Sequence, residues 1–76
     1  MKQENLLEII NSILENRGAE KVSFIERKMD LRNDLGLNSL DLAELTVKIE
    51  DITDIDIFED GLINTIEEIY QKLEIE

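Results

Sequence analysis

The stretch Asp34–Leu45, DLGLNSLDLAEL, decides the fold of this 76-residue chain because it marks where a loop ends and a helix begins. Asn38 closes the loop, and an apolar-periodic run follows it. Asparagine is a favoured N-cap, and Asp41, three residues later, completes a weak form of the capping box. We therefore predict a helix over 39–52, with Ser39 in its first turn.

Two further helices are expected, one on each side of that run. Residues 4–16, ENLLEIINSILEN, carry a broad apolar face, and Gly18 follows Arg17 as a stop with a cation in the last turn. Thr65 and Glu68 form the T-x-x-E capping box of a last helix. The expected buried faces are Leu6, Leu7, Ile9, Ile10, Ile13 and Leu14, then Leu42, Leu45, Ile49 and Ile52, then Ile66, Ile69, Tyr70 and Leu73.

Residues 19–38 show no sustained period, and we interpret them as a long ordered connector with room for a helical turn around 24–28. A short helix around 59–63 is a further expectation, with Ile55 or Ile57 docking on the core. The prediction is an all-α fold in one domain, residues 1–76: a small bundle of three main helices plus a possible short helix. The connector residues expected to reach the core are Val22, Phe24, Ile25, Met29, Leu31, Leu35 and Leu37.

Charge restricts the partners. The chain has 8 basic and 19 acidic residues, a net charge of −11, and residues 39–76 account for −10 of it. Nucleic acid and anionic membranes repel such a protein. No apolar run approaches the length of a membrane span, and the first residues lack the apolar core of a signal peptide. We expect a cytoplasmic monomer.

Most chemistry is excluded by residue type. The chain has no histidine, so Ser39 lacks the base that a Ser-His-Asp nucleophile needs, and no catalytic residue is expected. An EF-hand loop that starts at Asp56 would place Phe58, which cannot ligate calcium, at its third position. No metal ligands are expected, and the G-x-x-x-x-G-K phosphate loop is missing.

Two interpretations of Ser39 stay open at this point. Serine in the first turn of a helix often has only a structural role. A hydroxyl at a helix N-terminus is also well placed to hold an attached phosphate, because the backbone N–H groups and the helix dipole favour negative charge there. The preceding loop would give a modifying enzyme access.

Residues 35–45, LGLNSLDLAEL, resemble the phosphopantetheine attachment segment of the acyl carrier protein family, whose usual pattern is L-G-x-D-S-L followed by an acidic helix. The resemblance extends over most of the chain: its length, the first helix, the long connector, the acidic second helix and the last helix. The positions that match the pattern are Leu35, Gly36, Ser39, Leu40, Asp41, Glu44 and Leu45.

The resemblance implies that Ser39 carries 4′-phosphopantetheine, derived from coenzyme A, and that acyl or aminoacyl groups ride on its thiol as thioesters. It implies a non-enzymatic carrier in fatty-acid, polyketide, peptide or amino-acid-tethering chemistry. Asp41, Glu44, Glu50 and Asp51 would then dock on basic patches of the phosphopantetheinyl transferase and of the loading and processing enzymes. The residues expected to part and shelter a fatty chain are Ile10, Phe24, Ile57, Ile66 and the buried stripe of the second helix.

One departure from the family pattern is Asn38, which stands where the family usually has aspartate. Asparagine caps a helix equally well but lacks the charge, which leaves open which transferase recognises the protein. Two alternatives to an active carrier remain. One is an acidic helical interaction or calcium-responsive module without a covalent cofactor, and the other is a carrier-like domain that has lost its function.

Overall fold

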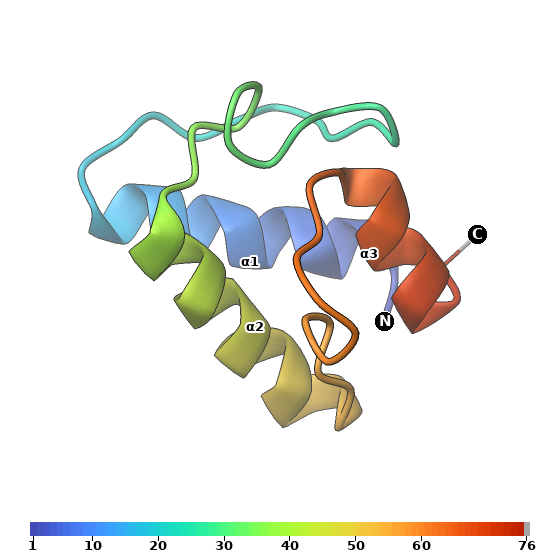
Figure 1. Ribbon diagram of the computed structural model, residues 1–76. Coiled ribbons are helices and arrows are strands. Elements are labelled where there is room, and N and C mark those ends of the chain that lie inside the picture. The colour runs from blue at the N-terminus through green and yellow to red at the C-terminus, as the bar shows by residue number, and fades with distance from the viewer. Residues whose placement is uncertain (76) are drawn as a thin grey trace.

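Three helices and the loops between them make up the computed structural model, which describes residues 1–75 (Figure 1). α1 spans Gln3–Asn16, α2 spans Ser39–Thr53 and α3 spans Ile66–Leu73. Over residues 1–75 the extended pairing is limited to an isolated bridge between Asp30 and Thr65. The predicted all-α fold is confirmed, and each helix begins within one residue of its expected start. Capping boxes mark the starts of α2 and α3 in the sequence, and the apolar periodicity marks α1.

The helices are arranged around one apolar core. α1 and α2 pack together, with the end of α1 beside the start of α2, and they diverge from that point (Figure 1). The connector runs back along α1 toward α3 and then returns to the start of α2 (Figure 1). The core residues contributed by the helices are Leu6, Ile10, Ile13, Leu14, Leu42, Leu45, Ile49, Ile66, Ile69, Tyr70 and Leu73.

The predicted buried stripes are correct except at their edges. Leu7 and Ile9 of α1 are half-buried, and Ile52 of α2 is 62% exposed. Ile9 and Ile52 flank an open groove between the two helices. The prediction for Ile52 was wrong because α1 has already diverged from α2 at that last turn, so no element covers the side chain.

The connector reaches the core through six of the seven residues that were predicted to do so. Leu31, Leu35 and Leu37 are buried, and Val22, Ile25 and Met29 are partly buried and pack against the core. Phe24 is 57% exposed and is therefore not a core residue. No helix forms over 24–28, but the amide of Met29 donates to the carbonyl of Glu26 at 3.0 Å and closes a single turn there. Hydrogen bonds to other elements hold the connector instead: the side chain of Asn11 accepts a bond of 2.8 Å from the amide of Val22 and donates one of 2.9 Å to its carbonyl. These bonds fix Val22 against α1.

The segment between α2 and α3 forms a turn rather than the expected short helix over 59–63. The side chain of Asp56 accepts a hydrogen bond of 2.9 Å from the amide of Phe58, and Gly61 has a φ of 125°, which a helix does not allow. Of the two candidates for docking on the core, Ile57 is fully buried and Ile55 is 37% exposed. The turn thus delivers Ile57 to the core.

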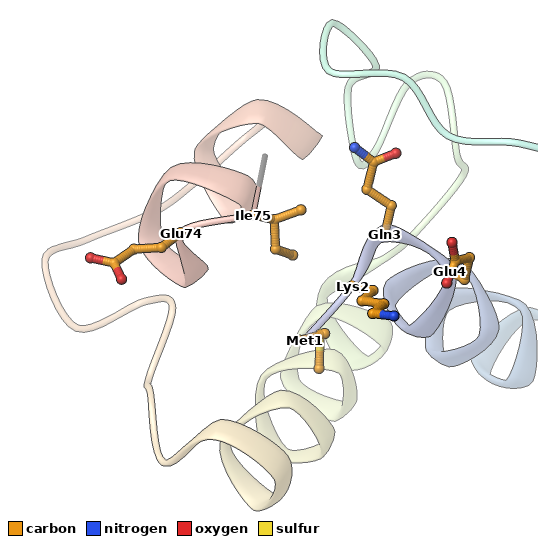
Figure 2. Close-up of a pocket in the computed structure, with 6 residues that line it drawn as sticks. All are labelled: Met1, Lys2, Gln3, Glu4, Glu74 and Ile75. Atoms are coloured by element: carbon orange, nitrogen blue, oxygen red, sulfur yellow. The ribbon is translucent and has the colours of Figure 1, made fainter.

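The two ends of the described chain lie close together. Met1, just before α1, and Ile75, just after α3, line the same pocket (Figure 2). Within residues 1–75, no helix combines the length and the apolar character needed to cross a membrane.

Candidate functional site

Ser39 is the first residue of α2, and its side chain is exposed. The residues on either side of it make the helix cap. The Asn38 side chain accepts a hydrogen bond of 2.8 Å from the amide of Asp41, and the Asp41 carboxylate accepts one of 3.0 Å from the amide of Asn38. The predicted capping box is confirmed in both directions. Capping the helix therefore does not use the hydroxyl of Ser39.

A second set of contacts ties this turn to α1. The Nε of Arg17 lies 2.9 Å from the Asp41 carboxylate, and its Nη2 donates a hydrogen bond of 2.8 Å to the carbonyl oxygen of Gly36. Asp41 is only 6% exposed and is the one buried charged residue in the described part of the chain. Burial and internal pairing favour a structural role for Asp41 over the docking role that we predicted for it.

The remaining acidic residues of the predicted docking surface, Glu44, Glu50 and Asp51, are exposed. Two apolar side chains lie among them: Leu40 is 81% exposed and Val47 is 59% exposed. They are seven residues apart, so they share one face of the helix. Neither residue was predicted as part of a docking surface, although the position of both outside the buried stripe of α2 was a usable signal.

An apolar pocket of about 250 Å³ opens beside Ser39. It lies between the start of α2 and the turn that follows α2, and the one charged residue in its lining is Arg32. Ser39 is therefore exposed to solvent and also lines an apolar pocket. The lining residues are Arg32, Ser39, Leu42, Ala43, Phe58 and Leu62.

The core residues expected to shelter a chain are only partly brought together. Ile10, Ile57 and Ile66 are fully buried, but Phe24 lies on the surface. Within residues 1–75, no cluster of three or more acidic, histidine or cysteine side chains is arranged to hold a metal ion.

Comparison with known proteins gives two matches that agree with this geometry. Residues 4–73 match the family model described as a phosphopantetheine attachment site. An acyl carrier protein of Trieres chinensis is 35% identical over 69 residues, which cover 88% of this chain and 86% of that relative. No solved structure matches the chain significantly.

The family match covers nearly the whole described chain, so the protein is of the class that carries covalently attached phosphopantetheine. The chain belongs to the acyl carrier protein family. Its function is to carry acyl groups on 4′-phosphopantetheine, and it is a carrier rather than an enzyme. A phosphopantetheinyl transferase and biosynthetic enzymes are the partners of such a protein. The alternative of an acidic interaction or calcium-responsive module without a cofactor is not supported.

Proposed function

We propose that Ser39 is the residue to which 4′-phosphopantetheine is attached, through a phosphodiester on its Oγ. The observation that carries this proposal is an exposed hydroxyl in the first turn of α2, where Asn38 and Asp41 already make the cap. The first-turn amides and the helix dipole favour a phosphate at that position. When attached, the arm supplies the thiol that holds the acyl group.

The other serines are poorer candidates. The hydroxyl of Ser12 donates a hydrogen bond of 2.9 Å to the carbonyl of Ile9 in the middle of α1, and the residue is only half-exposed. Ser23 is exposed, but it lies in the connector and not at a helix start. Ser39 alone combines exposure, a helix N-terminus and an adjacent apolar pocket.

The residues around Ser39 fit the arm chemically. The pocket offers Leu42, Phe58 and Leu62 to the apolar part of the arm. In the transfer, Ser39 Oγ forms a bond to the phosphorus next to the pantetheine, and the pyrophosphate bond of coenzyme A breaks to release adenosine 3′,5′-bisphosphate. The chain has no histidine, so the proton that leaves Ser39 Oγ goes to a base on the transferase.

We propose that the exposed face of α2 is the docking surface for the transferase and for the enzymes that use the carrier. This α2 docking face consists of Leu40, Glu44, Val47, Glu50 and Asp51, all of which are exposed. Acidic side chains around an apolar strip fit a partner with a basic patch and an apolar contact. Such contacts weaken as salt rises, which suits a carrier that must leave each partner quickly.

We further propose that residues 1–76 act as a single monomeric domain in the cytoplasm, and that the cargo is an acyl or aminoacyl intermediate of fatty-acid, polyketide or peptide synthesis. The Trieres chinensis relative is named an acyl carrier protein, which supports an acyl cargo. Its net charge of −11 disfavours nucleic acid as a partner.

The experiment that tests the attachment site is intact mass spectrometry. The protein is incubated with coenzyme A, magnesium and a broad-specificity phosphopantetheinyl transferase. We expect a gain of one phosphopantetheine in the wild type and in Ser23→Ala, and none in Ser39→Ala. A gain that persists in Ser39→Ala would place the attachment elsewhere.

If the wild type gains nothing while a control carrier is modified, Asn38→Asp tests whether the missing charge is responsible. Loading of that variant would trace the failure to transferase recognition. Failure of both proteins would support the interpretation of a carrier-like domain that has lost its function.

A further inference from the structure

The guanidinium of Arg17 bridges two points of the chain that enclose Ser39. Gly36, whose carbonyl accepts from Nη2 at 2.8 Å, lies three residues before the serine. Asp41, whose carboxylate lies 2.9 Å from Nε, is two residues after it. Arg17 is the C-cap residue of α1, so the contact fixes the start of one helix against the end of another.

Two backbone bonds and the helix cap also hold this turn. The amides of Gly36 and Leu37 donate to the carbonyls of Arg32 and Leu31, each at 3.0 Å, and the Asn38–Asp41 capping box closes the helix start. Gly36 itself has a φ of 72°, in the region that glycine enters without strain, and its carbonyl is held by Arg17. Without Arg17, the carbonyl of Gly36 would lose its hydrogen-bond donor, and the amides of Gly36 and Leu37 alone would hold this part of the turn.

The Asp41 end of the bridge is well shielded from water. Its side chain is 8% exposed, whereas that of Arg17 is 36% exposed. A buried carboxylate that loses its charged partner is strongly disfavoured, so the turn would rearrange to bring Asp41 into water. That movement would carry Ser39 with it, because Asp41 also forms the capping box with Asn38, the residue directly before Ser39.

We propose that Arg17 is a positioning residue for the attachment reaction: it holds the Ser39 turn in the geometry that the transferase needs. The inference rests on the proposed attachment at Ser39. Arg17 lies outside the α2 docking face, so it acts on the rate of transfer from the bound complex rather than on binding. Arginine is needed because one guanidinium makes both contacts at once, which the single ammonium of lysine does not reproduce.

The test compares Arg17→Met, Arg17→Lys and a control, Lys21→Met. Lys21 also carries one positive charge near the end of α1, where it pairs with Glu15 at 2.9 Å, but it does not contact the Ser39 turn. We expect Arg17→Met to lower kcat for loading at least about tenfold with KM within about twofold, because a small misplacement of a reacting group is costly. Arg17→Lys should restore only part of the rate, and Lys21→Met should match the wild type.

A second readout is independent of loading. Amide hydrogen exchange of residues 36–41 in the unloaded protein should accelerate in Arg17→Met, while exchange in α3 stays unchanged. If exchange in α3 also rises, Arg17→Met has lost global stability, and the comparison is then made with Arg17→Lys, which keeps a cation next to Asp41.

Two results would overturn the proposal. One is a folded Arg17→Met variant in which amide hydrogen exchange over residues 36–41 and kcat for loading both equal those of the wild type. The other is a lower KM with kcat unchanged, which would mean that Arg17 only repels a basic transferase. Failure of the proposed function itself has a different signature, since Ser39→Ala would still gain mass while the exchange result at Arg17 stands.

Discussion

The amide of Ile66, the first residue of α3, donates a hydrogen bond of 3.0 Å to the carbonyl oxygen of Met29 in the connector. The next amide, of Glu67, donates to the carbonyl of Arg27 at 2.9 Å. First-turn amides have no acceptor within their own helix, so the connector satisfies them. A helix of eight residues does not form alone in water, and α3 and the connector therefore stabilise each other.

Removing the cap of α3 should weaken this joint structure. Thr65 Oγ1 accepts from the amide of Glu68 at 3.3 Å, and the Glu68 carboxylate accepts from the amide of Thr65 at 3.2 Å. We expect Thr65→Ala to lower the free energy of unfolding by about 1 kcal/mol. For a domain of this size that is a fall in Tm of about 4–8 °C, measured by circular dichroism.

The matched control is Thr46→Ala. The hydroxyl of Thr46 bonds only to the carbonyl of Leu42 within α2, at 2.9 Å, and caps nothing. Its loss should leave Tm nearly unchanged. Equal falls in the two variants would argue against a special role for the cap of α3.

The two isoleucines near the end of α2 should respond very differently to truncation. Ile49 is fully buried and Ile52 is 62% exposed. We expect Ile49→Ala to cost about 2–5 kcal/mol, because it leaves a cavity in the core. Ile52→Ala should stay within about 0.5 kcal/mol of the wild type. Urea unfolding of both variants measures the difference, and similar losses would show that Ile52 is covered in solution.

Tyr70 carries a buried hydroxyl that has no hydrogen-bond partner within residues 1–75. An unpartnered hydroxyl is costly to bury, so we expect Tyr70→Phe to stabilise the protein by about 1 kcal/mol or more at pH 7. Denaturant unfolding of the two proteins gives this value. A loss of stability in Tyr70→Phe would mean that the hydroxyl has found a partner, such as an ordered water.

The same residue predicts a pH dependence. Burial raises the pKa of Tyr70 above its usual 10.0, although the nearby Arg27 guanidinium acts to lower it. A raised pKa means that the folded state favours the neutral phenol over the phenolate. The stability that the protein has with a neutral Tyr70 is therefore fully present below pH 10, and it is lost as pH rises through the folded pKa. Tm against pH should therefore fall less steeply above pH 10 in Tyr70→Phe than in the wild type. Parallel curves would contradict this.

Screening of the acidic half should stabilise the fold. Residues 39–76 carry a net charge of −10, which repels itself in the compact state. We expect Tm to rise with sodium chloride and with millimolar magnesium, without a sharp saturation point, because the effect is one of charge and not of a binding site. A Tm that is flat in both salts would contradict the prediction.

The helices could be predicted from sequence because their signals are local. The capping pairs Asn38–Asp41 and Thr65–Glu68 each span three residues, and the structure forms both of them. Burial at the edges could not be predicted in the same way. Whether Phe24 or Ile52 is covered depends on the path of another element, which no local pattern records.

The turn around Ser39 also has features that the local sequence predicts and features that depend on distant residues. The position of Ser39 at a helix start follows from its neighbours, and so does the acidic face after it. The contact between Arg17 and Asp41 joins two residues that meet only after the whole connector has folded. Sequence reasoning therefore assigned Arg17 to the end of its own helix and Asp41 to the surface, and it missed the contact that buries one of them.

The nearness of Met1 and Ile75 has a practical consequence for handling the protein. Both line the same pocket, at the end of the molecule away from the start of α2 (Figures 1 and 2). A surface tether or a fluorescent fusion joined next to Met1 or next to Ile75 would extend from this side. Ser39 and the first turns of α2 would stay turned toward the solution, so immobilised carrier would remain open to the enzymes that load and unload it.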